Sequence, residues 1–171
     1  MLAIATLGGI TDENGRWPQA AELPASPGLR VGTAAIDLEA DDSMVIAGGI
    51  TPGKAAGQEG RLRAVAIVLQ LKQTKLAMVA CDILMITRDL LDPVAAEIAQ
   101  STGIPASHVL INCTHTHHAP SATMIHGYGR DDRFCRTVQR ATVKAVQEAN
   151  AQLSKEDCQF YFQLGQEKTV G

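Results

Sequence analysis

Residues 75–113 read KLAMVACDILMITRDLLDPVAAEIAQSTGIPASHVLINC and contain the pattern that decides the fold. The run Lys75–Cys81 is apolar and β-favouring, and Arg88–Thr102 then carries apolar residues at helical spacing. Gly103 ends that helical segment, and Val109–Cys113 is a second β-favouring apolar run. Strand, helix and strand in this order predict a βαβ unit, whose crossover implies parallel pairing of the two strands.

Further elements flank this unit on both sides. Arg63–Leu71 precedes Lys75–Cys81 after a short polar connection, which predicts a β-hairpin, and Leu29–Leu38 is a candidate first strand. Apolar residues at helical spacing predict a second helix over Asp131–Gln152, and the alternation in Gln159–Leu164 is typical of a closing strand. The predicted fold class is therefore α/β, with a mixed sheet, a βαβ unit and flanking helices.

The domain organisation follows from where this regular pattern begins. Residues 29–171 are expected to form one α/β domain, because 171 residues with 46% hydrophobic content suffice for a single core. Residues 1–28 are rich in Gly, Pro and polar residues after an apolar start, which predicts an extended arm or the remnant of a signal segment. The apolar start lacks a basic segment and a clear cleavage site, so a signal peptide is not convincingly present.

Composition excludes several classes of function. The net charge of -3 and the scattered Lys and Arg residues argue against nucleic-acid binding. The four cysteines form no Cys-x-x-Cys pair, which argues against a disulfide scaffold or a cysteine-rich zinc module. No apolar run approaches the roughly 20 residues needed to cross a bilayer, so no transmembrane segment is predicted. The oligomeric state leaves no signal in the sequence.

A histidine cluster follows the last strand of the βαβ unit. On an extended backbone Cys113, His115 and His117 would project to one face, with His118 on the other, and a His-x-His pair can chelate one metal ion. Ligands of open α/β sheets collect at the carboxyl ends of parallel strands, which is where this cluster is predicted to lie. The alternative is that the histidines only cap the strand and bond to the backbone.

Other polar residues are weaker candidates. Asp82 follows a strand, where its carboxylate either orients a neighbouring histidine or caps the next turn. The acidic turn at Glu39, Asp41 and Asp42 is interpreted as solvated surface, and His126 is expected to face solvent from a loop.

The sequence resembles a known family. Gly32 and Asp37 in a strand, the Gly48-Gly49 break, Arg61-Leu62-Arg63-Ala64, Ala80-Cys81-Asp82 and above all Thr114-His115-Thr116-His117 resemble the amino-terminal catalytic domain of neutral/alkaline non-lysosomal ceramidases. The likeness runs from about Leu29 to Leu164, and the Thr-His-Thr-His-x-x-Pro stretch is its diagnostic part. Members are zinc amidohydrolases that split ceramide into sphingosine and a fatty acid, and they are usually exported or membrane-associated.

The resemblance implies a role for each histidine. His115 matches a zinc ligand, so Zn²⁺ is the expected cofactor, and His117 matches a catalytic or substrate-facing residue. The usual motif continues Ser-Gly-Pro, whereas this chain has His118-Ala119-Pro120. His118 therefore changes the wall of the pocket, where it is expected to contact substrate and to offer another proton donor.

The resemblance also implies that part of the site lies elsewhere. Family members are several hundred residues long and take a further histidine, a glutamate and a tyrosine as ligands from later segments, which this chain lacks. We therefore expect a fragment that binds metal weakly and is inactive alone, from a secreted or periplasmic protein with possible association with a membrane surface.

Three functions stay open at this point. The first is a zinc-dependent amidase of the ceramidase type, acting on a small-molecule or lipid amide. The second is a zinc hydrolase of the same fold with a non-ceramide substrate, and the third is a non-catalytic α/β module. A thiol nucleophile at Cys113 with His115 as base is disfavoured, because neighbouring same-face residues on one strand rarely reach that geometry.

Overall fold

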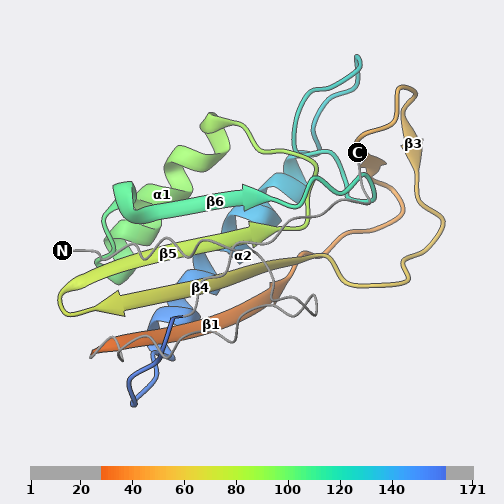
Figure 1. The fold of residues 1–171 in the computed structure, drawn as a ribbon. Coiled ribbons are helices and arrows are strands. Elements are labelled where there is room, and N and C mark those ends of the chain that lie inside the picture. Colours follow the sequence, from red (N-terminus) through yellow and green to blue (C-terminus); the bar gives the residue numbers. More distant parts are fainter. Residues whose placement is uncertain (1–27, 161–171) are drawn as a thin grey trace, which may run out of the picture.

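The computed structural model describes residues 28–160, and within them a mixed sheet carries two helices on one face (Figure 1). The sheet has the strand order β1-β4-β5-β6. Its strands are β1 (Leu29–Asp37), β4 (Arg63–Leu71), β5 (Thr74–Cys81) and β6 (Val109–Cys113). The β1–β4 and β4–β5 pairs are antiparallel and the β5–β6 pair is parallel, which confirms the predicted hairpin, βαβ unit and fold class.

Two of the described strands lie outside this sheet. β2 (Val45–Ile46) and β3 (Gly53–Lys54) form a small antiparallel pair, and Ile46 is also bridged to Pro120. The closing strand predicted over Gln159–Leu164 is not formed at 159 and 160, and its remainder lies outside the described residues. Residues 1–27 of the arm predicted for residues 1–28 lie outside them as well.

Local signals mark the end of the first helix and the beginning of the second. α1 (Arg88–Thr102) ends at Gly103, which has a left-handed backbone (φ 72°) and donates its N–H to the Ala99 carbonyl. α2 (Asp132–Ala151) begins after Asp131, whose carboxylate accepts the Phe134 N–H at 2.9 Å. Neither helix of the described part is both long and apolar enough to cross a membrane.

The core lies between the helices and one face of the sheet. Buried side chains of α1 and α2, such as Ile98 and Phe134, pack with the inward residues of β4 and β5 in a single cluster. On the opposite face Ile67 and Leu110 are exposed in one row across the sheet, in which Met78 lies between them. Strand alternation therefore places apolar side chains on both faces, and the two helices cover one of them.

The buried thiol of Cys81 makes stability depend on alkaline pH. Burial raises the pKa of Cys81 from 9.0 to about 11. Between these values the unfolded chain releases a proton that the folded chain keeps, so the free energy of unfolding falls as pH rises, by about 3 kcal/mol from this group. Denaturant unfolding at pH 8 and pH 11 should show a larger loss for the wild type than for Cys81→Ala. Equal losses in the two proteins would contradict this assignment.

Candidate functional site

The histidine cluster begins where the two parallel strands end. Cys81 and Cys113 are register partners at the ends of β5 and β6. Backbone hydrogen bonds between the two segments continue beyond this pair. Thr114 N–H donates to the Cys81 carbonyl at 2.9 Å, and His115 N–H donates to the Ile83 carbonyl at 3.1 Å. These bonds fix the backbone at the first histidine of the cluster.

The backbone at His115 breaks the predicted strand alternation. His115 has a left-handed conformation (φ 62°), and β6 has already ended at Cys113. The expectation that Cys113 shares one face with His115 and His117 rested on an extended backbone, so it fails for Cys113 at this turn. Cys113 is half-buried against the core, whereas both histidines are exposed.

One ring nitrogen of His115 is held by the backbone. Its Nδ1 lies 2.9 Å from the Leu84 carbonyl oxygen. A carbonyl can only accept a hydrogen bond, so Nδ1 carries the proton and the Nε2 lone pair points elsewhere. Metal-binding histidines typically have this arrangement, because a backbone acceptor fixes both the tautomer and the orientation of the ring. His115 therefore fits the role of a metal ligand through Nε2.

His117 lies beside His115 and against a glycine. The two imidazole rings have centroids 5.2 Å apart and an interplanar angle of 75°, an edge-on arrangement. A Cβ built on Gly48 would lie 2.5 Å from His117 Nδ1, so the ring packs directly on the Gly48 backbone. The Nδ1 edge of His117 is therefore covered by Gly48, and Nε2 is its open nitrogen.

The described residues do not assemble a complete metal centre. No group of three His, Cys, Asp or Glu side chains within residues 28–160 could hold one ion. Burial raises the pKa of the Cys113 thiol, which keeps it protonated at neutral pH. The raised pKa therefore argues against Cys113 as a nucleophile, since that role requires the thiolate.

Asp82 is engaged away from the histidines. Its carboxylate accepts the Arg63 N–H at 2.9 Å, and its own N–H donates to the Arg63 carbonyl at 2.9 Å. Both contacts join Asp82 to the first residue of the neighbouring strand β4, so they match neither of the two roles considered for Asp82, which were orienting a histidine and capping the following turn. His115 Nδ1 instead donates the hydrogen bond that orients the ring to the Leu84 carbonyl, an acceptor that no side-chain pattern in the sequence signals.

The remaining candidates are exposed. His118 donates its backbone N–H to Thr116 Oγ1 at 3.3 Å, and its side chain faces solvent. His126 is exposed at the tip of a tight turn, as expected. In the acidic turn Asp41 is exposed, and its pKa is lowered by hydrogen bonds from Ser43 and by the nearby Arg133.

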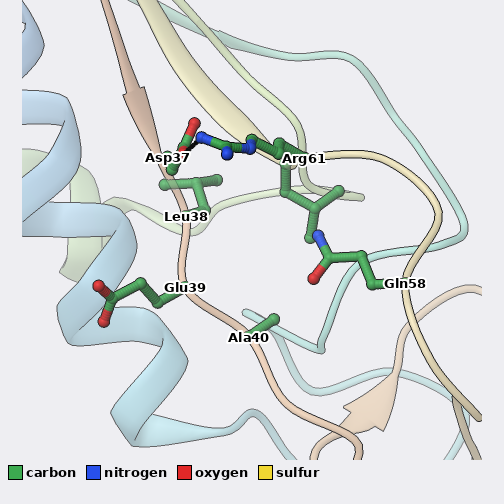
Figure 2. A pocket seen from close by; sticks show the side chains of 7 residues that line it. Asp37, Leu38, Glu39, Ala40, Gln58 and Arg61 are labelled. Atoms are coloured by element: carbon green, nitrogen blue, oxygen red, sulfur yellow. Dashed lines mark hydrogen bonds and ion pairs between the residues drawn. The ribbon is translucent and has the colours of Figure 1, made fainter.

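A surface hollow lies beside the end of β1 (Figure 2). Its volume is about 240 Å³, and Arg61 forms an ion pair with Asp37 at 2.6 Å along its wall. Glu39 points away from the Arg61 guanidinium in this view. A second hollow of about 430 Å³ is lined in part by Asp89 and Arg130, which form an ion pair. Neither of these two hollows is lined by a histidine, and both His115 and His117 are exposed.

These observations define a class of protein: a mixed α/β domain with two adjacent histidines just beyond the end of a parallel strand. No protein-family model and no curated protein matches the chain. Two solved structures share its fold. One is the neutral ceramidase of Pseudomonas aeruginosa, with a TM-score of 0.65 and 21% identity, and the other is a ceramidase complexed with C2, with a TM-score of 0.66 and 22% identity.

The likeness covers a large part of this chain and a small part of the other two. It includes 74% of the present chain and 22% of each ceramidase chain. The chain therefore has the fold of a portion of neutral ceramidase, as the resemblance of its motifs predicted.

Proposed function

We propose that this chain is the amino-terminal part of a zinc-dependent amide hydrolase of the ceramidase type. The observation that carries the proposal is the geometry of His115, whose Nδ1 bonds to the Leu84 carbonyl and whose Nε2 is free to bind a metal. The fold that the chain shares with neutral ceramidase also supports this proposal. Secretion or a periplasmic location, with contact to a membrane surface, belongs to this proposal.

Each histidine has a distinct part in the proposal. His115 Nε2 would hold the zinc ion, which supplies activation of water and polarisation of the substrate carbonyl. His117 exchanges a proton with the reacting groups through Nε2, because Gly48 covers its Nδ1 edge. His118, exposed at the same loop, contacts the substrate.

The proposal requires further ligands from a longer protein. Catalytic zinc generally takes three protein ligands and keeps one position for water, whereas residues 28–160 assemble no group of three. The chain covers only 22% of each ceramidase, so residues outside it have room to supply the others. The histidine pair is also uncovered here, and hydrolysis at a metal benefits from a site that excludes bulk water. We therefore expect the 171-residue chain alone to bind zinc weakly and to lack activity.

One observation favours a second candidate function, hydrolysis of a non-ceramide amide by the same site. His118-Ala119-Pro120 stands where the family motif has Ser-Gly-Pro. His118 is exposed and directly follows His117 in the chain. An imidazole there changes both the shape and the hydrogen bonding of the substrate pocket. The aromatic content of only 4% also gives little surface for a long lipid chain.

An assay of amide hydrolysis tests both functions. The chain, extended through any coding sequence that follows it in the natural reading frame, is assayed with N-acylsphingosine and with a short N-acyl amine. We expect zinc-dependent hydrolysis of at least one substrate, and His117→Ala should lower kcat/KM by about 100-fold or more, the scale of one general acid–base residue.

The matched control for this assay is His126→Asn. His126 is an exposed histidine with a left-handed backbone (φ 50°), which asparagine tolerates. It should keep full activity. A zinc-loaded protein that hydrolyses neither amide would overturn the proposed function and favour a non-catalytic module.

A further inference from the structure

His117 is an exposed side chain that nevertheless has a defined position. Exposed side chains normally change rotamer within picoseconds to nanoseconds. Two neighbours restrict this ring: the His115 imidazole at 5.2 Å and the backbone of Gly48. The position of His117 therefore depends on how firmly the Gly48-Gly49 turn is held.

The Gly48-Gly49 turn is tied down by one hydroxyl group. Gly48 N–H donates to Tyr128 Oη at 2.9 Å, and Tyr128 Oη donates to the Gly49 carbonyl at 2.9 Å. Glycines lose more backbone entropy on ordering than other residues, so two consecutive glycines need such a tie to stay in place. Gly48 also has a positive φ of 102°, a conformation that a residue with a side chain rarely adopts.

Tyr128 is itself fixed by local structure. Its ring is buried, with 8% of the residue exposed, and its backbone bonds reciprocally to Ile125 across the turn. The two central residues of that turn, His126 and Gly127, both have positive φ, which is the type I′ geometry of a two-residue hairpin. A rigid hairpin therefore presents the hydroxyl to the glycine turn.

We propose that Tyr128 is a positioning residue for the reaction, which acts by clamping the Gly48-Gly49 turn against the imidazole of His117. The proposal rests on the proposed function of His117 as the proton-exchanging group. The buried tyrosine holds the turn, the turn holds the Nδ1 edge of the ring, and the Nε2 edge stays directed to the open side. Tyr128 touches neither substrate nor metal in this scheme.

Tyr128→Phe tests the clamp, because it keeps the buried ring and removes only the hydroxyl. In nuclear magnetic resonance spectra of the chain, the wild type should show a cross-relaxation peak between the Gly48 Hα and His117 Hβ protons. Tyr128→Phe should lose this peak, and averaged coupling constants should show several rotamers at His117. In the hydrolysis assay kcat should fall about 10-fold, with KM within twofold of the wild type.

Two further variants keep the test independent of folding. Thr142→Val removes another buried hydroxyl, from α2, and should leave both the His117 signals and kcat unchanged. Gly48→Ala keeps the tyrosine and instead forces a methyl group against the His117 ring, and it should shift the same signals.

The readouts separate this inference from the proposed function. A His117 ring that stays ordered in Tyr128→Phe, with the Gly48 peak retained, would overturn the clamp. A mobile ring with unchanged kcat would support the clamp and overturn the role of His117 in hydrolysis.

Discussion

Loss of the His115 imidazole is expected to abolish specific zinc binding by the extended protein. His115 Nε2 is the proposed ligand atom, since the Leu84 carbonyl fixes the other nitrogen of this ring. Removing a group that hydrogen-bonds to a metal ligand typically lowers the metal affinity about 10–100-fold. Removing the ligand itself should therefore lower the zinc affinity at least about 100-fold. Elemental analysis and competition titration measure this change.

The choice of substitution matters at this position. The backbone of residue 115 is left-handed (φ 62°), a conformation that alanine adopts at a cost and glycine adopts freely. His115→Gly therefore removes the imidazole without backbone strain, and His115→Ala serves as the second variant. Loss of zinc in both, with unchanged unfolding temperature in His115→Gly, assigns the effect to the ligand. Stoichiometric zinc of wild-type affinity in His115→Gly would rule out His115 as a ligand.

Gly32→Ala is expected to destabilise the fold more than any exposed change. A Cβ at residue 32 of β1 would lie 1.9 Å from the Ala149 carbonyl oxygen and 3.1 Å from Leu153 N, and both are backbone atoms that cannot rotate aside. α2 would have to move away from the sheet and open the core. Overpacking of this kind typically lowers the free energy of unfolding by about 1–3 kcal/mol and occasionally by more. We expect a loss of about 3 kcal/mol, because the added methyl group would clash with backbone atoms.

Thermal unfolding measures this loss. For a chain of this size about 3 kcal/mol corresponds to a fall of roughly 10 °C in Tm. Gly53→Ala is the matched control, because a Cβ there meets nothing within 4 Å, and its Tm should change by no more than about 4 °C. Equal Tm values for the two variants would show that α2 does not approach β1 this closely.

The regular elements of this protein were predictable because local signals set them. Apolar alternation gave the strands, and helical spacing ended by Gly103 gave α1 nearly to the residue. The crossover length required parallel pairing of β5 and β6. The region around Val45–Ile46 was less predictable, because its partners lie at β3 and at Pro120, far away in sequence.

The site was only partly predictable. The pairing of His115 and His117 was visible as a motif, but the alternation argument that added Cys113 failed at a left-handed residue. In the sequence Asp82 was equally a candidate for orienting a histidine and for capping a turn. In the structure its carboxylate accepts a hydrogen bond from the backbone N–H of Arg63. Tyr128 had one local signal, the His126-Gly127 dipeptide of a tight turn, which indicates a hairpin but not what its hydroxyl will reach.

The elements, the parallel strand and the two histidines that follow it could be predicted because they depend on spacing between residues close in the chain. The tertiary structure alone decided which nitrogen of His115 is free and what holds His117 in place. Those outcomes depend on the Leu84 carbonyl and on the Tyr128 hydroxyl bonded to Gly48 and Gly49. Backbone carbonyls and glycines are present throughout any chain, so only their positions in space distinguish the few that orient a site.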